Sequence, residues 1–234
     1  MAKINMVTSL NTALHDSMAS DDTVLVMGED VGINGGVFRV TDGLFEKFGR
    51  KRVMDTPIAE SAILGSAIGM AMAGLKPVVE MQFSGFSYLM MHQLEGNASR
   101  MRTRSRGRFT VPLVVRMPYG GGVRALEHHS ESKEVYWAHT AGVKVVIPSS
   151  PANAGPLLIA AIQDPDPVVF MEPKRSYRSF KQKVEEEKNA FAIGKAHVVE
   201  TGKDITIISW GAMMRDTLKA VEEVKSQTEF SPEV

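Results

Sequence analysis

The feature that most constrains this chain is an alternation of short apolar runs with longer stretches of helical periodicity. Residues 23–27 and 111–117 are such runs, and glycine-rich sequence follows each of them. Runs of this kind indicate buried strands that end in loops. Apolar residues at helical spacing between 7 and 18 indicate a helix ahead of the first strand. Together these patterns predict an α/β fold, in which a mostly parallel sheet is flanked by helices.

The same periodicities continue along the chain. They predict further strands at 77–82, 143–148 and 167–172, and helices at 59–73 and 86–104. Ser150 and Pro151 suit the cap and the first position of one more helix.

The chain is long enough for at most two domains, since it has 234 residues and 44% hydrophobic content. Residues 172–189 are highly charged and lack apolar periodicity, so we interpret them as a linker. This gives a first domain at 1–188, with the linker at its end, and an incomplete second α/β domain at 189–234. The second part contains one strand, a glycine turn and one amphipathic helix, which cannot bury their faces alone. They need the first domain, another chain or more of a second domain to pack against.

Composition excludes several classes of function. The 27 basic and 27 acidic residues give no overall field for a polyanion or an anionic membrane. The absence of cysteine excludes disulfide scaffolds and thiolate zinc sites. No apolar run approaches the roughly 20 residues that span a bilayer, and the first residues lack a signal-peptide core. We therefore expect a cytoplasmic protein, whose only local basic concentration is the segment from Arg100 to Arg108.

Glu60 is the one acidic residue at the start of an otherwise apolar predicted helix. Thr56 and Pro57 suit the cap and first helical position, so a simple interpretation is that Glu60 complements the helix dipole. The rest of the helix suggests burial all round, because small residues recur at Gly65, Gly69 and Ala73 and most others are apolar. A carboxylate entering such a core must find a partner or line a cavity, which makes Glu60 a candidate for proton transfer.

Two loops carry further candidates. Glu29 and Asp30 follow a predicted strand, where ligands bind in open α/β sheets, although either residue could simply cap a turn. His128 and His129 lack the spacing that directs two imidazoles at one metal, so one of them is either a proton donor or an ordinary surface histidine. No phosphate-binding glycine motif occurs, so any phosphate must be held elsewhere.

Several long segments, in order, carry a family resemblance. They include GEDVGINGGVFRVTDGL, MDTPIAESAILGSAIGMAMAGLKPVVEMQFSGF, HHSES and AGVKVVIPSSPANAGPLLIAAIQDPDPVVFMEP. The chain resembles, nearly end to end, the β subunit of the thiamine-diphosphate-dependent decarboxylase component of 2-oxoacid dehydrogenase complexes, of pyruvate or branched-chain type. Family members continue past the last residue here, so the sequence looks C-terminally truncated.

The resemblance implies a transketolase-like pyrimidine-binding domain and an oxidoreductase that is active only with an α subunit. In this family the assembly is an α2β2 heterotetramer, and the α subunit holds magnesium and the cofactor's diphosphate. The substrate would be a small 2-oxo acid, and the acyl group would pass to a lipoyl-bearing acyltransferase core.

The resemblance also implies roles for individual residues. Glu60 corresponds to the glutamate that hydrogen-bonds the pyrimidine ring nitrogen of thiamine diphosphate, and Glu29 to an acidic residue near the cofactor. Phe86 corresponds to the aromatic residue on the pyrimidine ring, with Phe83 as its neighbour. His129 corresponds to the histidine near the thiazolium, with His128 beside it. A structural potassium ion would be bound by the carbonyls of Leu113, Ala161, Ile162, Asp164 and Asp166, although Pro165 and Asp166 replace common asparagines.

Two functions of other classes remain as alternatives. A scaffold subunit would hold a partner without turning over a cofactor, and its activity would not depend on Glu60. Anion or nucleic-acid binding through Arg100 to Arg108 would weaken as salt rises. No aromatic residue interleaves these arginines before Phe109, so a solvated helix end or salt bridges to a partner subunit are the simpler interpretation.

Overall fold

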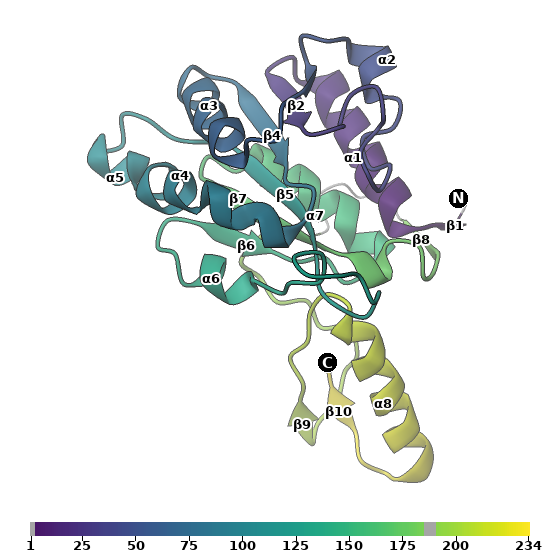
Figure 1. Ribbon diagram of the computed structural model, residues 1–234. Coiled ribbons are helices and arrows are strands. Elements are labelled where there is room, and N and C mark those ends of the chain that lie inside the picture. The colour runs from purple at the N-terminus through teal and green to yellow at the C-terminus, as the bar shows by residue number, and fades with distance from the viewer. Residues whose placement is uncertain (1–2, 185–190) are drawn as a thin grey trace.

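The computed structural model describes residues 3–184 and 191–234, and at its centre is a six-stranded sheet (Figure 1). Its strands are all parallel, in the order β3-β2-β4-β5-β7-β6. They are β2 (Val24–Gly28), β3 (Val53–Asp55), β4 (Lys76–Glu80), β5 (Val114–Tyr119), β6 (Lys144–Val146) and β7 (Val168–Pro173). The predicted α/β fold with a mostly parallel sheet is confirmed.

Helices cover both faces of the sheet. The α-helices are α1 (Met6–Ser20), α2 (Leu44–Phe48), α3 (Glu60–Met72), α4 (Met91–Gly96), α5 (Met101–Arg104), α6 (Glu134–Ala138), α7 (Pro151–Gln163) and α8 (Met213–Gln227). Short 3-10 helices are η1 (Ser84–Met90), η2 (Ala98–Arg100) and η3 (Lys174–Ser176). Helices α1 and α7 pack on one face, and α3 and α4 pack on the other (Figure 1). Among the described residues, no helix has both the length and the apolar character needed to cross a bilayer.

Neighbouring residues of each strand belong to different cores. Val78 and Val114 are paired across β4 and β5 and contribute to the core under α1 and α7. The next pair, Val79 and Val115, contributes to the core under α3 and α4. Because side chains alternate along a strand and both faces are covered, the strands appear in the sequence as continuous apolar runs.

The helix predicted at 86–104 is wrong as a single element. The segment consists of η1, α4, η2 and α5 in succession. The break falls at Gly96 and Asn97, where Asn97 has φ −122° and ψ −67°. Glycine has low helix propensity, and the Asn97 side-chain amide donates a hydrogen bond to the Gln93 side-chain oxygen at this break.

The predicted linker at 172–189 is also wrong in its first part. Glu172 lies inside β7 and is 0% exposed, and Lys174 and Tyr177 are buried as well. Farther on, β8 (Gln182–Lys183) pairs antiparallel with β1 (Lys3–Ile4). Residues 185–189 of the predicted linker, with the expected boundary at 188, lie outside the described residues. The division into domains at 1–188 and 189–234 therefore stays a prediction.

Residues 205–234 form a small unit beside the sheet. It contains β9 (Ile205–Thr206), α8 and β10 (Pro232–Glu233), with β10 parallel to β9. Figure 1 shows this unit projecting away from the six-stranded sheet. Val221 and Val234 are buried in this unit, but several other apolar side chains are exposed, with Ile208 at 84%.

Candidate active site

Glu60 is the first residue of α3, and residues 56–59 connect it to the carboxyl end of β3. Its helix cap differs from the prediction, because Ala59 rather than Thr56 is the N-cap and provides no side-chain bond. The Glu60 side chain is therefore alone in complementing the first turn of the helix. Glu60 is only 3% exposed, and its Oε2 atom is buried with no hydrogen-bond partner in residues 3–184 and 191–234. Such an atom costs about 1–3 kcal/mol unless a ligand or partner supplies a donor.

Helix α3 is not buried all round, which corrects the expectation from its composition. Ser61, Ala62, Ser66 and Gly69 are exposed, while Ile63 and Leu64 are buried in the core. A Cβ added at Gly69 would contact nothing within 4 Å. The small residues thus leave one face of α3 free in this chain.

Glu29 and Asp30 have different surroundings at the carboxyl end of β2. Asp30 accepts hydrogen bonds from Asn34 and Gln82, so its carboxylate shapes the loop. Glu29 is buried, and burial is the main cause of its raised pKa. The negative charges of Glu60 and Asp30 raise this pKa further. The interaction with Glu60 brings two of the predicted site residues to one edge of the sheet, where β2 and β3 are adjacent.

We expect Glu29→Gln to raise the melting temperature at pH 7. The pKa of Glu29 lies above its ordinary value of 4.5, so the folded state binds this proton more tightly than the unfolded state does. The charged carboxylate therefore costs folding free energy above pH 4.5, and glutamine removes that cost. Each kcal/mol gained adds about 2–4 °C for a chain of this size.

The gain from Glu29→Gln should fade as the pH falls below 4.5, where both states are protonated. Thermal unfolding at pH 7 and pH 4 measures this difference. Glu46→Gln on the exposed side of α2 serves as the control and should change little at either pH. A gain that is equal at both pH values would contradict the prediction.

An aromatic cluster surrounds His129. Its ring centroid lies 4.3 Å from that of Phe83 and 5.4 Å from that of Phe86. His129 Nδ1 lies 2.8 Å from the Glu127 carbonyl oxygen. His128 is more exposed, has a φ of 65° and lies 6.4 Å from Phe86 between ring centroids. The structure thus brings both phenylalanines together with His129.

Lys174 is a site residue that the sequence analysis missed. It is buried, and its ammonium donates a hydrogen bond to the His129 carbonyl oxygen and lies over the Phe83 ring. Burial lowers its pKa. On the other side of the loop, a side chain at Gly85 would overlap the His128 backbone, so only glycine allows this approach. Lys174 lay in the stretch interpreted as a linker, where nothing distinguished it from its charged neighbours.

A buried ion network lies within the sheet, behind the candidate site. Arg116 donates to Glu172 through Nε at 2.6 Å and Nη2 at 2.9 Å, and to Glu80 through Nη1 at 2.7 Å. Tyr177 donates to Glu172 at 2.6 Å. Burial raises the pKa of Glu80, although the charge of Arg116 opposes the rise. One charged residue within each of three apolar strands was the signal that could have predicted this network.

The predicted potassium ligands gather near the end of α7 and the start of β7. Lys144 Nζ lies 2.7 Å from both carboxylate oxygens of Asp164, and Arg102 Nε lies 2.7 Å from Asp166. The Leu113 carbonyl accepts the Val168 amide, and the Ala161 carbonyl accepts the Asp164 amide. The side chains are thus paired with the protein's own cations, and the Arg102 salt bridge lies within the chain. Ile162 is buried beside them, and the potassium site stays a prediction.

The fold and the carboxylates at its carboxyl edge define a class of domain. The family described as "Transketolase, pyrimidine binding domain" matches residues 2–179, and "Transketolase, C-terminal domain" matches residues 194–234. The solved structure "Split gene transketolase, inactive beta4 tetramer" has a TM-score of 0.76, covering 100% of this chain and 71% of its own. It is 17% identical, so this likeness concerns the fold.

Curated relatives narrow the class. "Pyruvate dehydrogenase E1 component subunit beta" of Acholeplasma laidlawii is 55% identical over 97% of this chain and 69% of its own length. The Bacillus subtilis protein of that name is 50% identical over 96% of this chain and 69% of its own length. "3-methyl-2-oxobutanoate dehydrogenase subunit beta" of Mycobacterium tuberculosis is 47% identical over 99% of this chain and 66% of its own length. The chain therefore belongs to the family of pyruvate and branched-chain 2-oxoacid dehydrogenase β subunits.

Proposed function

We propose that this chain is the β subunit of an enzyme that oxidatively decarboxylates a 2-oxo acid, pyruvate or a branched-chain one, and passes the acyl group to a lipoyl group. The observation that carries the proposal is the buried Oε2 atom of Glu60, which has no partner within the part of the chain that the structure describes. Its position at the start of α3, in a chain 55% identical to a pyruvate dehydrogenase β subunit, supports a role for it at a cofactor.

The residues of this edge of the sheet fit the pyrimidine half of thiamine diphosphate. When bound, this cofactor supplies the electron sink that decarboxylation of a 2-oxo acid requires. Glu60 would accept a hydrogen bond from the protonated pyrimidine ring nitrogen and so keep that proton in place, because its unpartnered oxygen needs a donor. Glu29 lies near enough to Glu60 that negative charges on the two carboxylates repel each other. This repulsion favours keeping a proton in the site. Phe86, with Phe83 beside it, would provide the apolar surface for the ring.

His129 is the proposed proton donor on the open side of the site. The Phe83 and Phe86 rings orient its imidazole, and Lys174 holds its carbonyl oxygen. These contacts favour His129 over His128 for this role. Because the ring is only partly buried, a substrate or an incoming lipoyl arm can reach it.

We further propose an α subunit as partner, in an α2β2 assembly that also holds magnesium and the diphosphate. The exposed face of α3 and the exposed side chains of Ile58, Tyr88 and Leu89 offer apolar surface for such a partner. The lipoyl-bearing acyltransferase core, the cytoplasmic location and the potassium ion at Leu113, Ala161, Ile162, Asp164 and Asp166 belong to the same proposal.

Coexpression with a candidate α subunit tests the function. The purified complex, supplied with thiamine diphosphate and magnesium, should release CO2 from pyruvate or from 3-methyl-2-oxobutanoate, and the ratio of the two rates assigns the substrate. The chain without its partner should be inactive, since it lacks a phosphate-binding glycine motif. An assembled, cofactor-loaded complex that decarboxylates neither acid would contradict the proposal.

A further inference from the structure

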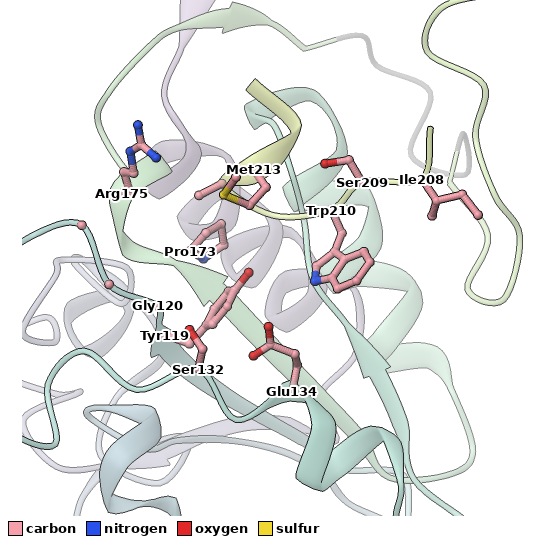
Figure 2. A pocket seen from close by; sticks show the side chains of 13 residues that line it. Tyr119, Gly120, Ser132, Glu134, Pro173, Arg175, Ile208, Ser209, Trp210 and Met213 are labelled. Atoms are coloured by element: carbon pink, nitrogen blue, oxygen red, sulfur yellow. The ribbon is translucent and has the colours of Figure 1, made fainter. Parts of the chain in front are cut away.

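A cavity of about 430 Å³ lies where β5 and β7 end against the segment before α8 (Figure 2). Its volume falls within the range of about 300–1,000 Å³ that is typical of small-molecule sites. Among the described residues, its lining contains none of Glu29, Glu60, Phe86 and His129. It is therefore separate from the candidate active site.

Glu134, in the first turn of α6, places a carboxylate in this cavity. Its Oε2 atom is buried and has no hydrogen-bond partner among the described residues. Arg175 is the other charged residue in the described lining, and it forms a salt bridge in which its Nη1 lies 2.8 Å from Asp216 Oδ2. A carboxylate oxygen removed from water without a donor is unfavourable, so this site is suited to a ligand that donates hydrogen bonds.

Two aromatic rings form the walls beside this carboxylate. Figure 2 shows the Tyr119 ring and the Trp210 indole facing the same hollow as the Glu134 carboxylate. Tyr119 is buried, and its pKa is raised first by burial and then by the negative charge of Glu134. Trp210 is 51% exposed and presents its ring to the cavity. Gly211, with a φ of 59°, allows this segment to approach, because a side chain there would overlap the Tyr119 hydroxyl.

We infer that this cavity binds an organic cation of the guanidinium or alkylammonium class, with its charged head at Glu134 and its stem against Trp210. A carboxylate and aromatic faces attract a cation together, through hydrogen bonds to the carboxylate and the quadrupole of each ring. An anion would be repelled by Glu134, and the described lining has no unpaired positive charge to attract it. The cation can be a free amine or guanidine, or an arginine or lysine side chain of another polypeptide. This inference does not depend on the proposed decarboxylation.

Titration of the full chain with n-butylguanidinium, followed by tryptophan fluorescence, tests the site. The chain has 2 tryptophans, and Trp137 is buried, so a change in the emission of exposed indole reports Trp210. We expect saturable binding that is at least tenfold tighter than that of the neutral isostere n-butylurea. Glu134→Gln should weaken binding of the guanidinium at least tenfold, whereas Glu223→Gln on the exposed side of α8 should not change it.

Calorimetry with Trp210→Leu provides a second variant at an exposed position, and binding should again fall severalfold. A peptide containing one arginine distinguishes the two sources of the cation. Tighter binding of the peptide than of butylguanidinium would assign a polypeptide partner, and weaker binding of the peptide would assign a small cation. Equal affinities for the urea and the guanidinium would overturn the inference. So would unchanged binding in folded Glu134→Gln or Trp210→Leu.

Discussion

Replacing Glu60 by glutamine should lower the rate of 2-oxo acid decarboxylation by at least about 100-fold, the lower limit for losing a positioned general acid or base. Glutamine preserves the shape of the side chain but cannot hold or transfer a proton at the pyrimidine ring nitrogen. Because Glu60 Oε2 has no partner among the described residues, the substitution removes no described hydrogen bond of that atom. Steady-state CO2 release by the coexpressed complex, with thiamine diphosphate and magnesium at saturation, measures the effect.

Two controls make the Glu60 experiment specific. The variant should still unfold cooperatively and assemble with the α subunit as the wild type does, since the lost function is chemical rather than structural. Glu46→Gln, on the exposed side of α2, should retain full activity. Wild-type turnover by Glu60→Gln would refute the proton-transfer role and favour the alternative of a scaffold subunit.

Replacing Arg116 by methionine should destabilise the chain by about 3–5 kcal/mol, the typical cost of removing one partner from a buried ion pair. The substitution leaves Glu80 and Glu172 buried without their shared cation, while Tyr177 still donates to Glu172. For a chain of this length the loss corresponds to a decrease in melting temperature of about 6–20 °C. Urea unfolding at pH 7 measures the free energy directly.

Arg102→Met is the matched control, because it makes the same chemical change at an exposed ion pair. The Arg102 side chain is 44% exposed and pairs with Asp166. Pairs of this kind contribute about 0–1 kcal/mol, so the loss should be several times smaller than for Arg116. Equal losses in the two variants would mean that burial of the Arg116 network does not determine its energetic importance.

The sequence by itself determined the architecture, because the signals for strands and helices are local. Apolar runs marked β2 and β5, helical spacing marked α1, and the pair Ser150 and Pro151 marked the start of α7, where the Ser150 cap is present. The long ordered resemblance indicates the family without any knowledge of contacts. The break at Gly96 and Asn97 was missed because the apolar spacing continues through it.

Only the tertiary structure decided how charged residues are used. Arg116 and Glu172 are 56 positions apart, and Lys174 and His129 are 45 apart, so no local pattern relates them. A charge is stable inside the sheet only when the fold brings its counterion to it. The start of the expected linker is buried because the fold provides such partners there. The same holds for Glu60 and Glu134: the sequence shows a carboxylate, but only the packing around it shows whether an oxygen lacks a donor and is therefore suited to bind a ligand.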